Sequence, residues 1–279
     1  YQRSTTKPFE MPSATEPRKL AEPELPDETR PPTEQSLQPK IERPEPAERE
    51  SPPAVIKTPS PVPALLPAAV SEPILKNIGF NLGVYDPTTK RAGDVLFINA
   101  IGDHFDNKIF LEFAQEVLGP DGKKILPHPT YFLPLGTKLI SPVQAKVENI
   151  RYQERDNDYE IILIPNGLNN WRISFDHIIK LTLRVGDNIN AGDIIGEVAQ
   201  RNSSAIPPEL GWTELQLWKS TATAPLAYCP FLFLDAAVKS DIETKILRLT
   251  EDWEAFIGKG VYAQEKWVSP GCLAENAPG

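Results

Sequence analysis

Three histidines are present in the chain, and His177 is the one whose surroundings suggest chemistry. It stands in the segment SFDHI, shortly before the glycine-rich phrase RVGDNINAGDIIG. Imidazole carries protons near neutral pH and is a common metal ligand. A phrase of this kind is typical of compact β-scaffolds that hold a metal or carry a prosthetic group. The alternative without chemistry is that His177 pairs with a neighbour such as Asp176.

The glycine-rich phrase itself predicts local structure. Gly186 and Gly192 each precede an aspartate, and glycine supplies the positive φ that tight turns need. We expect the isoleucines of the phrase, Ile189, Ile194 and Ile195, to point into a small core. The phrase is similar to that of the barrel-sandwich hybrid folds, which include lipoyl and biotinyl carriers, phosphotransferase domains, membrane-fusion adaptors and M23 peptidases.

The flanking segments narrow this choice. PLGTKLISPVQAKVENI lies upstream, SFDHI follows, and GWTELQLW comes after the glycine-rich phrase. In order and spacing, roughly residues 126–219 resemble the M23 (lysostaphin-like) peptidases. The resemblance implies a mainly β chain with a barrel-sandwich hybrid core, also called a duplicated hybrid motif. A carrier role is disfavoured because no lysine stands at the expected hairpin tip, and the only methionine is Met11.

The resemblance also implies where a zinc ion would be held. An M23 peptidase uses a histidine, an aspartate four residues on, and the second histidine of an H-x-H motif. Those positions fall on Leu126, Thr130 and Glu214, and the first H-x-H position falls on Trp212. A remaining catalytic histidine corresponds to His177.

We therefore expect a catalytically degenerate domain that holds no metal. Its cleft would be formed by His128, Thr130, Trp212 and Glu214, with His177 as a vestige of the catalytic set. In the alternative, His128, His177 and Glu214 hold zinc in a shifted register, since two histidines and a glutamate are an accepted zinc set. The chain would then be a zinc metallo-endopeptidase that cleaves peptidoglycan.

Outside this region the composition changes. Seventeen of the 30 prolines lie before Ile74, in a stretch poor in apolar residues, so we expect a disordered Pro/Glu-rich tether at 1–73. A β-rich N-terminal extension is expected at 74–124, the hybrid-motif domain at 125–220, and a C-terminal segment at 221–279.

The C-terminal segment should contain one helix at about 240–257. Ser240 and Glu243 form a capping box, and Gly258 is placed to end the helix. Its apolar residues recur at helical spacing and are Ile242, Ile246, Leu249, Trp253 and Phe256.

The composition limits which partners the protein can bind and in which compartment it works. The net charge of −9 argues against a nucleic-acid partner, and no run of 18 apolar residues is present to span a membrane. Cys229 and Cys272 would form one disulfide in an exported protein and would stay reduced in the cytosol. We expect an exported chain, periplasmic or on the cell surface, tethered through a segment before Tyr1. Its expected partner is peptidoglycan or an envelope protein, and a purely structural envelope module is the competing interpretation.

Overall fold

The computed structural model describes residues 71–102, 105–119, 122–200 and 206–279. All of them lie in one unit of the chain, residues 64–279. The tether predicted at 1–73 therefore falls almost wholly outside the described residues. No helix in the described ranges is long and apolar enough to cross a membrane.

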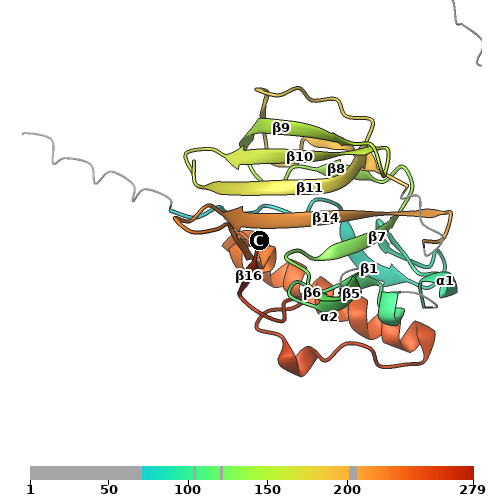
Figure 1. The fold of residues 1–279 in the computed structure, drawn as a ribbon. Helices are drawn as coiled ribbons and strands as arrows, with labels where there is room; N and C mark the ends of the chain where they lie inside the picture. Colours follow the sequence, from blue (N-terminus) through green and yellow to red (C-terminus); the bar gives the residue numbers. More distant parts are fainter. Residues whose placement is uncertain (1–70, 103–104, 120–121, 201–205) are drawn as a thin grey trace, which may run out of the picture. The chain divides into compact units, whose positions relative to one another are not determined.

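A large antiparallel sheet dominates this unit (Figure 1). Its central order is β12-β9-β10-β11-β14-β15-β16, with β7 pairing to β14 and β4, and β13 to β11 and β8. The strands are β4 (Phe110–Leu111), β7 (Thr130–Pro134), β8 (Lys138–Ile140), β9 (Ala145–Gln153), β10 (Asp158–Pro165), β11 (Trp171–Ile179), β12 (Asn188–Ile189), β13 (Ile194–Val198), β14 (Leu210–Lys219), β15 (Leu226–Tyr228) and β16 (Asn276–Pro278). The prediction of a mainly β fold is confirmed.

Smaller elements surround this sheet. They are β1 (Leu82–Asp86), β2 (Arg91–Gly93), β3 (Val95–Leu96), the hairpin of β5 (Glu116–Gly119) and β6 (Gly122–Ile125), the short helix α1 (Asn99–Gly102), and 3-10 turns at Phe105–Asn107, Pro230–Phe233 and Gln264–Lys266. Strands from outside 125–220 join the large sheet, because β4 pairs with β7 and β15 pairs with β14.

Strand β14 shows how the sequence sets the two faces of the sheet. Thr213, Leu215 and Leu217 are buried, and the alternate residues between Trp212 and Trp218 are only partly buried. This period of two is that of a strand with one face in the core. Glu214 lies on the partly exposed face, directly across from Asp176 on β11.

The glycine-rich phrase forms the predicted turns. Gly186 and Gly192 have φ of 97° and 91°. In each turn the following aspartate accepts a backbone hydrogen bond, Asp187 from Arg184 N at 2.8 Å and Asp193 from Asn190 N at 2.7 Å.

The isoleucines of the phrase do not all face the core. Ile189 and Ile195 are buried, but Ile194 is 48% exposed, contrary to the expectation. Consecutive residues of a strand point to opposite faces, so Ile194 and Ile195 cannot both be core residues.

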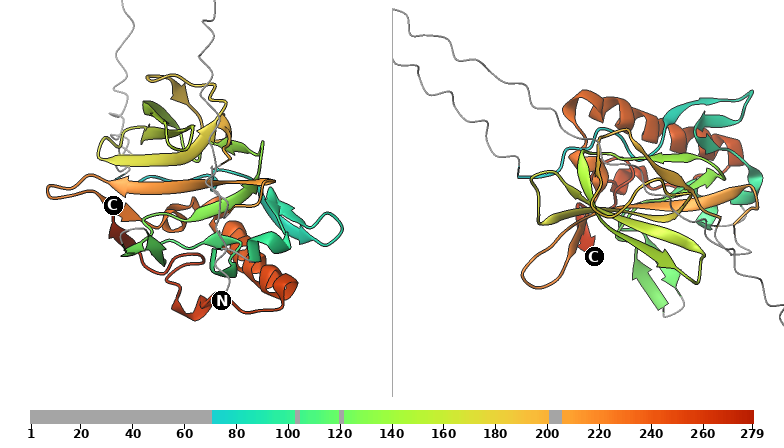
Figure 2. Two further views of the ribbon diagram at one scale, coloured as in Figure 1. Left: turned by 45° about the vertical axis from the view of Figure 1, so that its right-hand side comes forward. Right: turned by 90° about the horizontal axis from the view of Figure 1, so that it is seen from above.

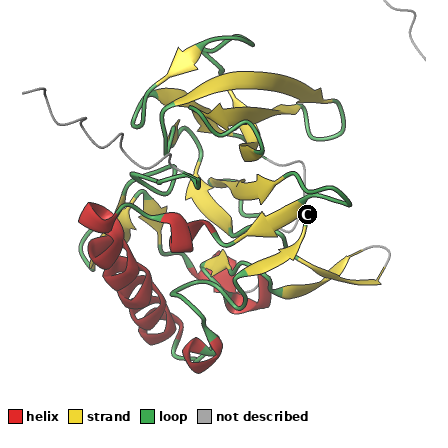
Figure 3. Cartoon of the chain, turned by 90° about the vertical axis from the view of Figure 1, so that its left-hand side faces the viewer, coloured by secondary structure: helices red, strands yellow, loops and turns green. Residues whose placement is uncertain are grey.

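The long helix, α2 (Ala236–Ile257), begins earlier than predicted. Its N-cap is Asp235, whose Oδ1 accepts a hydrogen bond from Ala237 N at 2.8 Å, and Ser240 lies inside the helix. Gly258, with φ 68°, ends it as expected. Figures 1 and 2 show β9, β10 and β11 on one side of β14 and α2 on the other, and Figure 3 shows the helix along its length.

The helix packs through the predicted apolar residues. Ile242, Ile246, Leu249 and Trp253 are buried, together with Thr250. Trp253 is fully buried against Phe97, with ring centroids 5.5 Å apart, and its Nε1 donates to Asn107 O at 2.7 Å.

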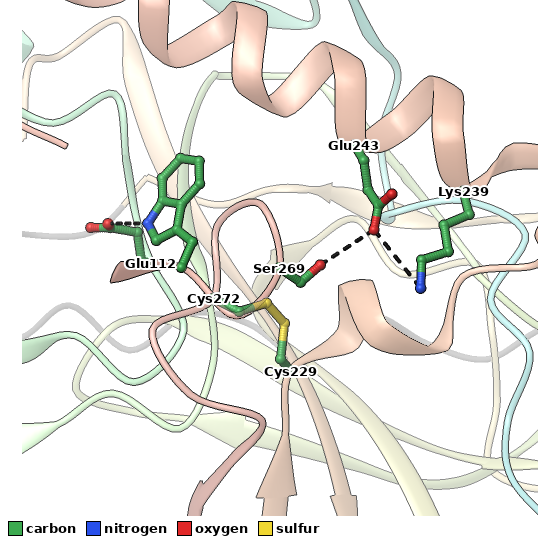
Figure 4. The surroundings of a disulfide bond; sticks show 7 residues. Glu112, Cys229, Lys239, Glu243, Ser269 and Cys272 are labelled. Atoms are coloured by element: carbon green, nitrogen blue, oxygen red, sulfur yellow. Dashed lines mark hydrogen bonds and ion pairs between the residues drawn. A yellow bond between two sulfur atoms is a disulfide. The ribbon is translucent and has the colours of Figure 1, made fainter. Parts of the chain in front are cut away.

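Cys229 and Cys272 form a disulfide with both residues fully buried (Figure 4). The Cys272 segment lies beside Phe113, which donates its N–H to Gly271 O at 3.0 Å and accepts from Leu273 N at 3.0 Å. The disulfide thus anchors the chain just before β5.

The same segment also reaches α2. Ser269 Oγ donates to Glu243 Oε1 at 3.4 Å, as Figure 4 shows. At the base of the β5–β6 hairpin, Ala114 N donates to Leu126 O and Leu126 N donates to Gln115 O, both at 2.9 Å. The β5–β6 hairpin is therefore fixed at its base: the chain that enters it bonds the Cys272 segment through Phe113, and the chain that leaves it continues into β7.

Candidate functional site

A cavity of about 550 Å³ opens on the partly exposed face of the large sheet. One group of lining residues comes from the segment before β7 and is largely apolar: Phe105, Asp106, Leu111, Val117, Leu118, Lys124 and Leu126. The other group comes from the sheet and the turn after β9 and is largely polar: Thr130, Gln153, Asp156, Asp176, His177, Trp212 and Glu214. The β5–β6 hairpin thus contributes to a cavity with an apolar side and an acidic side.

The structure brings together the three positions at which the resemblance places zinc ligands. Thr130 on β7 and Glu214 on β14 are direct cross-strand partners, and Leu126, just before β7, lines the same cavity. Trp212 lies two residues before Glu214 on the same strand and also lines the cavity, as does His177. The expected cleft residues therefore meet in one place, with one exception.

That exception is His128, which contacts Glu214 but is not among the residues that line the cavity. Its Nε2 is 3.1 Å from Glu214 Oε2, and its Nδ1 is 3.3 Å from Thr130 Oγ1. Burial lowers the pKa of His128 and outweighs the opposite effect of the Glu214 charge. The His128 ring thus contacts Glu214 through one nitrogen and Thr130 through the other.

His177 sits at an irregularity of β11. Its φ of 60° is unusual for a residue other than glycine, and the β10–β11 register shifts opposite this point. In a regular strand, Asp176 and His177 would point to opposite faces. Here both line the cavity, so the irregularity turns two polar side chains toward one space.

The imidazole of His177 is held by Asp158 rather than by Asp176. His177 Nδ1 is 2.6 Å from Asp158 Oδ2, and the ring lies 5.2 Å from that of Trp212. Asp176 Oδ1 instead accepts hydrogen bonds from the His177 backbone N–H and from Gln153 Nε2. The expected pairing of His177 with Asp176 is therefore wrong for the ring.

Burial alone would lower the pKa of His177. The hydrogen bond to Asp158 and the nearby carboxylates of Asp176 and Glu214 reverse this effect, and the pKa lies above its ordinary value.

Asp158 is a site residue that the sequence reasoning missed. It is the first residue of β10 and is fully buried. The partner of His177 becomes visible only when β10 and β11 are set in register, with Tyr159 opposite Ile178. Counting residue pairs outward from residues 166–170, the NGLNN segment that joins β10 to β11, would have placed Asp158 near His177.

The residues at the position where the M23 resemblance implies zinc do not fit a zinc ion. Leu126 has no donor atom, Thr130 offers a neutral hydroxyl, and Glu214 is engaged by His128. The alternative set of His128, His177 and Glu214 is not gathered into a metal-sized group within the described residues. Among the described residues, the group that could surround a metal ion is Asp158, Asp176 and His177, with one ligand atom from each within 4.8 Å of the others.

A second, smaller hollow of about 200 Å³ lies further along β14. Glu160, Gln216, Trp218, Pro225 and Gly279 line it. Gln216 and Trp218 continue the alternation that exposes Trp212 and Glu214, so both hollows lie along one strand face.

No protein-family model and no curated protein sequence matches the chain. Among solved structures it is similar to lysostaphin, with 22% identity over 45% of this chain and 51% of that chain and a TM-score of 0.36. The chain thus spans about half the length of that protein. The catalytic domain of lysostaphin from Staphylococcus simulans gives 20% identity over 44% and 86% of the two chains and a TM-score of 0.34. The catalytic domain of a prophage-encoded M23 protein, EnpA, from Enterococcus faecalis is 18% identical over 43% of this chain and 88% of that chain, with a TM-score of 0.32. The chain therefore resembles M23 (lysostaphin-like) peptidases in solved structures, at low identity and over part of its length, as its sequence predicted.

Proposed function

We propose that this is a catalytically degenerate M23-like domain of an exported protein, and that it acts by binding peptidoglycan or an envelope protein in its cleft. One observation carries the proposal. The cleft is formed, but Leu126, Thr130 and Glu214 meet where the resemblance implies zinc ligands.

The loss of family chemistry follows from these residue types. Zinc in a hydrolase polarises the scissile carbonyl and lowers the pKa of its bound water to about 7. A leucine, a threonine and a glutamate engaged by a histidine do not supply the three ligands that such an ion needs. His177 keeps a partner in Asp158, so it remains positioned, but the water that it would assist has no activating ion at that position.

Binding is supported by what the cleft retains. Its volume suits a short peptide or a sugar unit, and apolar and polar groups face the same space. Trp212 and Trp218 are partly buried on the open face of β14, where indole rings can stack on a ligand. The buried disulfide fits a protein that matures in an oxidising compartment.

The test is co-sedimentation of the full chain with purified peptidoglycan sacculi, together with an assay for released muropeptides. We expect saturable binding without release. Trp212→Ala should weaken binding, whereas Val84→Ser should leave it unchanged, since Val84 is exposed on β1, which contributes nothing to the cleft. Release of muropeptides by the unaltered chain would contradict the proposal, as would binding that Trp212→Ala and Val84→Ser affect equally.

The active-enzyme alternative needs His128, His177 and Glu214 around one zinc ion. The geometry does not favour it, because His128 does not line the cavity and His177 is held by Asp158. Muropeptide release that requires zinc and is abolished by His128→Gln would establish it.

A further inference from the structure

We infer that Asp158, Asp176 and His177 form a binding site for a divalent transition-metal ion, away from the position implied by the M23 resemblance. Asp158 begins β10, and the other two residues lie at the irregularity of β11. The inference concerns metal binding alone and does not depend on a cell-wall ligand.

The geometry is close to that of a coordination sphere. One ligand atom from each residue lies within 4.8 Å of the other two, and His177 Nδ1 is 2.6 Å from Asp158 Oδ2. Zinc bonds to histidine nitrogen and carboxylate oxygen are about 2.0–2.2 Å long, which separates tetrahedral ligands by about 3.4 Å. Modest side-chain shifts would therefore close the group around an ion.

A second observation points to a missing ligand. Asp158 has a side chain that is 0% exposed, and its Oδ1 has no hydrogen-bond partner in the described structure. A buried carboxylate oxygen without a protein donor is unfavourable, and a bound cation would compensate it. Within the described residues the one ion pair of Asp158 is with His177, so no lysine or arginine neutralises it.

The site is open on one side. Asp176 and His177 line the cavity, so an ion can enter from it and can take an exogenous oxygen ligand there. Three protein ligands and one open position is the usual arrangement of an accessible zinc site. The imidazole nitrogen selects against calcium and magnesium, which take oxygen ligands, and favours zinc and its first-row neighbours.

The test is zinc binding by the tag-free full chain, stripped with a chelator and titrated with zinc alone by calorimetry. We expect one zinc ion per chain. Asp158→Asn and His177→Gln should each weaken binding at least about tenfold, since loss of even an outer partner of a metal ligand costs 10–100-fold. Excess calcium or magnesium should not compete.

Asp106→Asn is the matched control, because it removes a carboxylate from the opposite, largely apolar side of the same cavity and Asp106 is not a proposed ligand. It should retain zinc binding. If Asp158→Asn fails to fold, the partly buried Asp176 gives a second test through Asp176→Asn.

Absence of zinc binding would overturn the inference. Binding that survives these substitutions but is lost in Glu214→Gln would overturn it too, and would place the ion at the His128–Glu214 pair. Because no wall material is present, these outcomes are independent of the sacculus-binding test.

Discussion

Removal of the Cys229–Cys272 disulfide should destabilise the domain by an amount that depends on the length of the loop that the disulfide closes. The two cysteines are 43 residues apart in sequence. Cross-linking a loop of this length lowers the entropy of the unfolded chain by about 13 cal/mol/K, or about 4 kcal/mol at 25 °C. We expect Cys229→Ala combined with Cys272→Ala to lower the free energy of unfolding by about this much.

The assay is urea unfolding followed by tryptophan fluorescence, with the unaltered chain in reducing agent as the matched control. The double variant and the reduced chain should unfold at similar urea concentrations. Hydrogen exchange should also accelerate at Phe113 and in the β5–β6 hairpin, because the Cys272 segment bonds Phe113 on both sides. A loss below about 1 kcal/mol would refute the reasoning and would show that packing alone holds the segment.

Three further predictions concern the core, pH and the lost metal position. Trp253→Ala should lower the free energy of unfolding by about 3–5 kcal/mol in urea, because it empties a fully buried site under α2. Burial lowers the pKa of His128 in the folded state, so below the unfolded-state pKa of about 6.5 the unfolded chain binds more protons than the folded chain. The free energy of unfolding should therefore be highest above this pH and should fall as the pH drops below it. Comparison of urea midpoints at pH 7.5 and 5.5 should show that His128→Gln reduces this dependence. Leu126→His, Thr130→Asp and Glu214→His together, in a chain that also carries Asp158→Asn, should create zinc binding with a Kd of about 1 µM or tighter by calorimetry; a folded variant that binds no zinc would show that the residue correspondence is wrong.

Local patterns predicted the parts of this fold that local physics determines. The two glycine turns formed because only a residue without a Cβ readily takes positive φ at Gly186 and Gly192. The helix appeared because its apolar residues repeat at helical spacing and Gly258 terminates it. The resemblance groups Leu126, Thr130 and Glu214, and in the structure all three line one cavity, with Thr130 and Glu214 paired across β7 and β14.

The features that the sequence did not reveal depend on contacts between distant segments. Asp235 caps α2 instead of Ser240, and it is also bonded by Lys76, 159 residues away. Asp158 reaches His177 only through the register of two strands and an irregular backbone. A pattern read over a few neighbouring residues does not show which distant residues come into contact, so it predicts neither the Lys76–Asp235 contact nor the Asp158–His177 contact.

The pairing of β4 with β7 and of β15 with β14 has a practical consequence for anyone who isolates part of this chain. A fragment limited to residues 125–220 would lose both flanking strands and leave backbone N–H and C=O groups of β7 and β14 unpaired. Exposed strand edges of that kind recruit strands from other molecules. Such a fragment should self-associate, and its insolubility would say nothing about the ligand-binding ability of the intact domain.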